Sequence, residues 1–390
     1  MTGSWRAVDE LLAAAVADGE VPGLIAVTGT SADVLHEFTA GVRSTGTGAP
    51  MTPDTVLRIA SQAKLATSVM ALQLIEQGRL GLDDPVGDIL PDFDQLLVLD
   101  GFDDAGQPML RTPRSRATVR QLLTHTSGLG YDFWNRKLAR YYRVSRQLPL
   151  ATGLRAAFTA PLVADPGTRF SYSMSMDWLG LVIEAVHGKP LDECLAVQVT
   201  GPLGMTDTVM WLDPDRAERQ ATVHVRADQG GWTPVPADYY AARDRLPEFY
   251  AGGHSMYATA RDYLRLQQEI LRRPGDPGAG LLQPATAAEL FADHLGGLDV
   301  GIIETADQAT SEEVDLRGLK WSLGLLVNAD GVESLWPAGS AGWAGGFNSF
   351  YWIDRQVGIA AALYTQTLPF YDPSIVRLAI SFRDAVYAAL

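Results

Sequence analysis

A serine and a lysine three residues apart, Ser61 and Lys64, form the sharpest chemical feature of the sequence. The apolar residues that follow recur at helical spacing, which predicts a helix from about Ser61 to Gln77. Residues three apart on a helix share one face, so the amine can reach the hydroxyl. At the helix start, the Ser61 N–H lies among unpaired donors that favour an oxyanion. A lysine desolvated in a cleft has a lowered pKa and can help to deprotonate the serine.

A serine and a lysine with this spacing also arise by chance on a solvated helix, so the pair alone is a weak signal. Two further segments could complete its chemistry. Tyr172 offers a phenol that can take the serine proton and later return it to a leaving alkoxide. Its ordinary pKa is about 10, so it needs the charge of Lys64 nearby to work at neutral pH. The run Trp343–Gly346 offers an apolar wall, an indole donor and small residues. The alternatives are an aromatic core residue at 172 and a glycine-rich hairpin at 343–346.

Composition excludes several other kinds of function. The net charge of −15 disfavours nucleic acid, whose phosphates need basic patches. No apolar run reaches the length of about 18 residues that a membrane span needs. The start of the chain lacks the pattern of a signal peptide, which predicts a cytoplasmic protein. The single cysteine, Cys194, excludes an internal disulfide and is expected to be a buried structural thiol.

Other catalytic patterns are missing from the sequence. The histidines show neither metal-ligand spacing nor the context of a catalytic triad. There is no Gly-x-Ser-x-Gly elbow and no dinucleotide or P-loop glycine pattern. We therefore expect no metal and no cofactor.

Strands at both ends of the chain, with helices between them, predict an α+β protein whose antiparallel sheet is built from both termini. Residues 1–60 and 300–390 are expected to form the lobe that holds the sheet, and residues 61–299 an inserted, mainly helical lobe. The two lobes form one catalytic unit with a cleft between them. The expected elements include helices over 5–19 and 375–390 and strands over 23–29, 34–41, 321–327, 347–354 and 357–364.

Several motifs together resemble the serine β-lactamase and penicillin-binding-protein superfamily, and within it the class C β-lactamase-like esterases (family VIII carboxylesterases) and the lovastatin-pathway acyltransferases. The matching segments are Val21–Gly23, Leu57–Lys64, Leu82–Val86, Gly101–Gly106, Leu122–Leu129, Pro166–Ser173 and Leu203–Met205. The resemblance implies a β-lactamase/transpeptidase-like fold. It also implies that Ser61 is the nucleophile and that Lys64 and Tyr172 handle its proton.

The resemblance extends to residues around this trio. It implies that the N–H groups of Ser61 and Gly346 hold the oxyanion and that Trp343 and Gly345 contact the substrate. Tyr131 and Asp177 match residues that line the cleft in these esterases, although either could be purely structural. His125 matches a residue of a structural turn.

Two departures bear on the substrate. Met174 stands where β-lactamases usually have asparagine, and Trp343 stands where they have the lysine of Lys-Thr-Gly. We therefore expect a serine hydrolase that cleaves small carboxylic esters, with no particular oligomeric state implied. The rivals are an acyltransferase that passes the acyl group to an alcohol or amine, a β-lactamase or D-amino-acid peptidase, and a non-catalytic binding protein of the same fold. The intact Ser61, Lys64 and Tyr172 disfavour the last.

Overall fold

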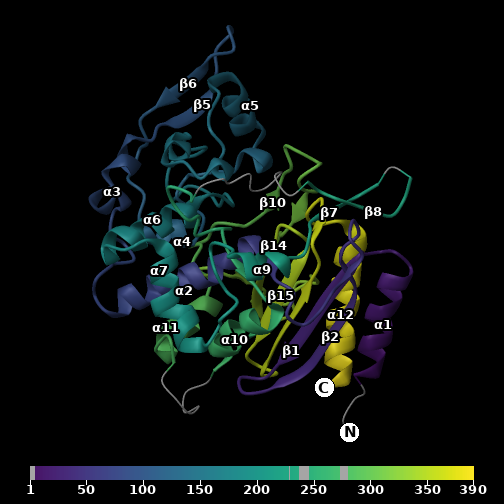
Figure 1. Cartoon of the computed structure of the whole chain (residues 1–390). Helices are drawn as coiled ribbons and strands as arrows, with labels where there is room; N and C mark the ends of the chain where they lie inside the picture. The colour runs from purple at the N-terminus through teal and green to yellow at the C-terminus, as the bar shows by residue number, and fades with distance from the viewer. Residues whose placement is uncertain (1–4, 228, 237–245, 273–279) are drawn as a thin grey trace.

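The main sheet of the protein is assembled from the two ends of the chain, as a computed structural model shows for residues 5–227, 229–236, 246–272 and 280–390 (Figure 1). Within these residues, eight strands pair in the order β12-β13-β14-β15-β16-β1-β2-β3. In that order the strands are Lys320–Trp321, Leu326–Val327, Ala341–Gly345, Ser349–Asp354, Ile359–Tyr364, Gly23–Gly29, Val34–Ser44 and Ala49–Pro50. Every pairing in this sheet is antiparallel. The predicted antiparallel sheet built from both termini is confirmed.

Helices cover the sheet on both sides. The terminal helices α1 (Arg6–Ala17) and α12 (Pro373–Ala389) pack together beside the purple strands β1 and β2 (Figure 1). Helix α10 (Ala260–Leu271) packs against β1, β15 and β16. Strands β1 and β14–β16 are buried along their whole length, which explains why they read as apolar runs instead of alternating patterns.

The remaining elements form a mainly helical region beside the sheet (Figure 1). Its helices are α2 (Ala63–Glu76), α3 (Val86–Ile89), α4 (Val119–Leu123), α5 (Arg136–Ser145), α6 (Ser175–His187), α7 (Leu191–Leu195), α8 (Gly201–Leu203), α9 (Pro214–Glu218) and α11 (Pro284–Ala288). Outside the main sheet, short strands form three two-stranded sheets among the described residues: β4 (Leu57–Arg58) with β9 (Tyr257–Ala258), β5 (Val98–Phe102) with β6 (Pro108–Arg111), and β10 (Ile302–Ile303) with β11 (Val314–Asp315). A further small sheet has β7 (His224–Arg226) between β17 (Thr367–Leu368) and β8 (Trp232–Pro234).

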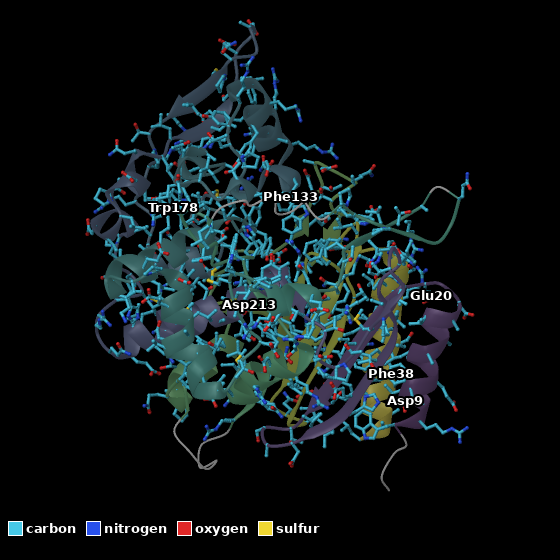
Figure 2. All side chains as sticks on the ribbon, viewed as in Figure 1. Asp9, Glu20, Phe38, Phe133, Trp178 and Asp213 are labelled. Atoms are coloured by element: carbon cyan, nitrogen blue, oxygen red, sulfur yellow. The ribbon has the colours of Figure 1, made fainter. Side chains whose placement is uncertain are left out.

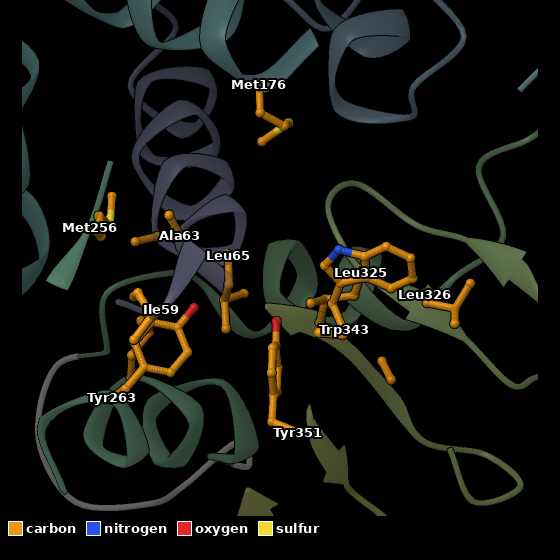
Figure 3. Packing of buried hydrophobic residues seen from close by; sticks show 14 of the residues in the cluster. Ile59, Ala63, Leu65, Met176, Met256, Tyr263, Leu325, Leu326, Trp343 and Tyr351 are labelled. Carbon is orange, nitrogen blue, oxygen red and sulfur yellow. The ribbon is translucent and has the colours of Figure 1, made fainter. Parts of the chain in front are cut away.

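Helix α2 runs through the interior and is buried on nearly all sides. A helix that is apolar all round belongs to the core of a large domain. Leu65 in its first turn lies near Tyr351 of β15, and Ile59 before the helix lies beside Tyr263 of α10 (Figure 3). The short helix α4 begins at Val119, and Thr118 before it is the N-cap, which forms a capping box with Gln121.

Two predicted elements differ in kind from those in the structure. The helix over 61–77 begins two residues later, because Ala60–Gln62 form a turn of 3₁₀ helix before α2. The expected strand over 321–327 is a hairpin in which Lys320 pairs with Val327 and Trp321 with Leu326. Gly324 has a φ of +137° in its turn, a conformation that the apolar pattern of this segment does not reveal.

The proposed division into lobes at residues 60 and 300 stays a prediction. Helix α10 belongs by sequence to the inserted segment but lies on the sheet. Among the described residues, no helix combines the length and apolar character needed to cross a membrane.

Candidate active site

The candidate nucleophile, Ser61, lies in the 3₁₀ turn that leads into α2. Ala60 before it has a φ of +45°, an uncommon left-handed conformation for a residue with a side chain. Such strain clusters at functional sites, where the surrounding structure holds it in place. Ser61 is half-buried, whereas Lys64 one helical turn later is only 1% exposed.

Lys64 points at the Ser61 hydroxyl. Its Nζ lies 3.0 Å from Ser61 Oγ and donates to the carbonyl oxygen of Gly253 at 2.9 Å. Burial lowers the pKa of Lys64 to about 7, although the charge of Asp177 acts in the opposite direction. A lysine with this pKa is partly neutral at neutral pH and can accept a proton from the serine.

Tyr172 completes the predicted trio. Its hydroxyl lies near Ser61, which acts to lower the pKa of the phenol, and it accepts a 2.7 Å hydrogen bond from the indole N–H of Trp343. Lys64 Nζ lies 4.7 Å from the centre of the tyrosine ring. Burial raises the pKa of Tyr172 despite the opposing effects of Ser61 and Trp343, so the phenol is neutral at physiological pH. The indole donor that we expected to face a substrate is therefore already used within the protein.

His125 holds the loop that carries Tyr172. Its carbonyl accepts the Ser171 N–H at 2.8 Å, and its Nδ1 accepts the Ser173 N–H at 3.3 Å. His125 has a φ of +54°, a left-handed conformation typical of a turn residue. Its ring packs against that of Tyr172, with the two ring centres 4.6 Å apart. Burial and the nearby Lys64 keep the pKa of His125 well below its ordinary value. These contacts agree with the structural turn expected for the Leu122–Leu129 motif.

Asp177 lies in the first turn of α6 and is fully buried. Its carboxylate accepts hydrogen bonds from the Gly253 N–H at 2.8 Å and the Tyr131 hydroxyl at 3.2 Å. Its Oδ1 also lies 3.4 Å from His254 Nδ1. Burial alone would raise the pKa of Asp177, but His254, Lys64 and the Gly253 N–H together hold it below its ordinary value. The carboxylate therefore contacts the Gly253 N–H and the His254 ring and acts on Lys64 through its charge, while its expected place in the substrate pocket stays a prediction.

The strand β14 runs against the nucleophile turn. A Cβ at Gly345 would lie 2.5 Å from the carbonyl oxygen of Ile59, so only glycine allows this close approach. Gly346 follows the strand, and a Cβ there would lie 4.0 Å from Cβ of Ala60. Gly346 is thus beside the turn of Ser61, as an oxyanion donor must be. The oxyanion role of the two N–H groups stays a prediction.

Aromatic side chains surround the trio. The rings of Tyr131, Trp134, Trp321 and Trp343 each lie within 6 Å of the Tyr172 ring, and Phe133 stacks on Tyr131 at 5.0 Å. The described residues hold no group of three or more His, Cys, Asp or Glu side chains placed to bind a metal ion.

The sequence did not reveal the segment 252–254. Gly252 and Gly253 let the backbone approach α6, since a Cβ on them would lie 2.5 Å from Met176 O and 2.9 Å from Asp177 Oδ1. Two adjacent glycines before a histidine were a signal, but only the fold puts them beside Lys64. Trp134 was likewise missed.

Comparison with known proteins places this geometry in a family. The family model described as Beta-lactamase matches residues 8–380. The chain belongs to the β-lactamase family. Its relatives include an esterase and acyltransferases, the two kinds of enzyme that the resemblance in the sequence indicated.

Three relatives show the range of activities in this family. Acyltransferase calJ of Penicillium decumbens is 31% identical over 91% of this chain and 86% of its own length. Esterase EstB of Burkholderia gladioli is 30% identical over 98% of this chain and 94% of its own length. The solved structure of unliganded simvastatin synthase (LovD) from Aspergillus terreus matches with a TM-score of 0.84 and 29% identity, over 98% of both chains. This β-lactamase-family chain thus has both acyltransferase and esterase relatives.

The lowered pKa of Lys64 predicts how the ester cleavage expected at Ser61 depends on pH. Only the neutral amine can accept a proton, so kcat/KM should rise about tenfold per pH unit on the acid side and level off above about pH 7. A pH–rate profile with a neutral ester checks this. Because the charge of Asp177 raises the pKa of Lys64, Asp177→Asn should move the midpoint to lower pH. A profile that stays flat through the acid range would contradict the role of Lys64 as a base.

Proposed function

We propose that this protein is a serine hydrolase that cleaves small carboxylic esters through an acyl-enzyme on Ser61. The observation that carries the proposal is the 3.0 Å contact between Lys64 Nζ and Ser61 Oγ, made by a buried amine whose pKa is near 7. Tyr172, whose hydroxyl lies near the same serine, supplies a second proton-handling group. A nucleophile in reach of a base that is itself held by other groups is the general arrangement for covalent catalysis.

The proposed reaction starts when Lys64 takes the proton of Ser61 as its oxygen attacks the ester carbonyl. The N–H groups of Ser61 and Gly346 then stabilise the oxyanion. Because Tyr172 is a neutral phenol, it can donate its proton to the leaving alkoxide and recover one from Lys64. The alkoxide leaves as an alcohol, and water releases the acid from Ser61 by the same steps in reverse order.

The walls of the site favour a neutral, apolar substrate. Trp343 replaces a cation on the strand beside Ser61, and its N–H is bonded to Tyr172. The rings of Tyr131 and Trp134 offer further apolar surface. A carboxylate on the substrate close to the reacting ester would lack a charged partner there, which is costly in a desolvated site.

Acyl transfer to an alcohol is the second candidate. It uses the same acyl-enzyme, with an alcohol in place of water as the acceptor. The acyltransferase calJ and the simvastatin synthase, which match most of this chain, favour it as much as Esterase EstB favours hydrolysis.

The substrate preference gives a direct test. We expect efficient cleavage of p-nitrophenyl acetate or butyrate and a kcat/KM for cephalosporins at least about 10³-fold lower, because the β-lactam carboxylate lacks a partner. Initial rates with both substrate classes measure the ratio. Equal values would overturn the esterase proposal in favour of a β-lactamase.

The same assay separates hydrolysis from transfer. Product analysis of p-nitrophenyl butyrate turnover, with and without an added alcohol, gives the ratio of butyrate to butyryl ester. Butyrate as the main product at moderate alcohol concentration supports the hydrolase. A butyryl ester as the main product would replace it with the acyltransferase.

A further inference from the structure

One segment of this acidic protein is entirely without acidic residues. The chain has a net charge of −15, yet residues 133–164 contain no Asp or Glu. The same segment contains six cations: Arg136, Lys137, Arg140, Arg143, Arg146 and Arg155. Five of these fall within or directly after α5, and all five side chains are exposed. A concentration of positive charge against the overall balance attracts anions to this surface.

The cations of α5 are directed to two sides. Lys137 donates to the carbonyl of Asp100, and Arg140 lies over the ring of Phe102 at 4.0 Å, so both face the β5–β6 hairpin. Arg136 and Arg143, seven positions apart, lie on the other side. Together with Ala139 and residues 305–308 they line a pocket of about 570 Å³. That volume lies within the range of small-molecule sites.

The two pocket arginines lie near the carboxylate of Asp307 but are not paired with it. In the described part of the chain, neither forms an ion pair, and Arg136 donates only to the carbonyl of Thr305 at 3.3 Å. The carboxylate of Asp307, which also lines the pocket, accepts bonds from the Ala309 N–H and the Thr310 hydroxyl in its own turn. Asp132 lies near Asp307, and burial together with the charge of Asp307 raises the pKa of its carboxyl group. The guanidinium groups of the pocket are therefore available to a ligand.

The pocket is connected to the candidate active site through Phe133 and Trp134. The Ala306 N–H donates to the carbonyl of Phe133 at 2.8 Å, which ties the pocket loop to the residues before α5. Phe133, labelled in Figure 2, lies between the helical region and the sheet. Trp134 is two residues before Arg136, so their Cα atoms are within about 7 Å. The Trp134 ring is 5.1 Å from that of Tyr172.

We propose that the pocket between α5 and residues 305–308 binds a phosphate ester group, carried on a substrate at a distance from its scissile ester. Two guanidinium groups present the fork-shaped donors that match phosphate oxygens, and the other cations of α5 add attraction over longer range. The pocket itself needs no assumption about catalysis, whereas its role in substrate choice rests on the proposed ester hydrolysis. The arginines of this pocket offer an anionic substrate group the charged partner that Trp343, beside Ser61, cannot offer.

Calorimetric titration with pyrophosphate tests the pocket without relying on activity. We expect saturable binding by the unmodified protein and binding at least about fivefold weaker in Arg143→Gln, which loses charge-assisted hydrogen bonds. Lys137→Gln is the matched control, because it removes the same charge from the same helix outside the pocket and should change affinity less than twofold. Absence of saturable binding, or equal weakening by both variants, would overturn the site.

Kinetics with a pair of esters tests the substrate role. One ester carries a phosphate on an extended leaving group and the other is its dephosphorylated counterpart. We expect KM to be at least about fivefold lower for the phosphorylated ester, and this advantage to disappear in Arg143→Gln while hydrolysis of the neutral ester is unchanged. Equal KM values despite pyrophosphate binding would mean a site for a free anion and would overturn the substrate role. If neither ester is cleaved, the proposed ester hydrolysis is wrong. The titration with pyrophosphate still tests whether the pocket binds phosphate.

Discussion

Replacing Ser61 with alanine should lower kcat for ester hydrolysis by at least about 10⁴-fold, because no acyl-enzyme can form without the hydroxyl. The methyl group of alanine fits wherever the serine side chain fits, so the thermal unfolding temperature should change little. The measurement is the initial rate with p-nitrophenyl butyrate, corrected for the uncatalysed reaction.

Ser68 in α2, two turns after Ser61, provides a matched control. It is fully buried and its hydroxyl has no hydrogen-bond partner among the described residues, whereas Ser61 is half-buried and contacts Lys64. Ser68→Ala should therefore keep nearly full activity. Activity retained in Ser61→Ala, or lost equally in both variants, would contradict the assignment of the nucleophile.

Removing either proton-handling group should lower kcat by at least about 10²-fold, the scale of lost acid–base assistance. We suggest Lys64→Met and Tyr172→Phe, because both side chains are buried and a smaller residue would leave a cavity. Lys64 and Tyr172 contact the same serine and handle one proton, so the double variant should be little worse than the poorer single variant. Steady-state kinetics of the three variants measure the coupling.

Independent action would give a different result. If the losses of the single variants multiplied in the double variant, Lys64 and Tyr172 would serve separate steps. Thermal unfolding of each variant provides the control, since Tyr172→Phe leaves the indole N–H of Trp343 without its acceptor in a buried position.

Much of the site was predictable because its key residues are close in sequence or belong to distinct motifs. Ser61 and Lys64 are on one helix face by spacing alone, and the structure brings Tyr172, Trp343 and Gly345 to them from other elements. The sheet was predictable because β1, β15 and β16 are apolar runs bounded by turn residues.

What could not be predicted depends on contacts between distant segments. The carbonyl of Gly253 accepts from Lys64 across 189 positions, and no local pattern indicates this. The same holds for the bond from the Gly253 N–H to Asp177, which joins residues 76 positions apart. The first turn of the predicted helix was wrong because the left-handed conformation of Ala60 has no signature in composition.

The central claim is that Ser61 carries the acyl group, and peptide mass spectrometry tests it most directly. After reaction with a fluorophosphonate, the account predicts one adduct, located on the peptide that contains Ser61 and absent from Ser61→Ala. An adduct on a different serine, with Ser61 unmodified, would contradict it.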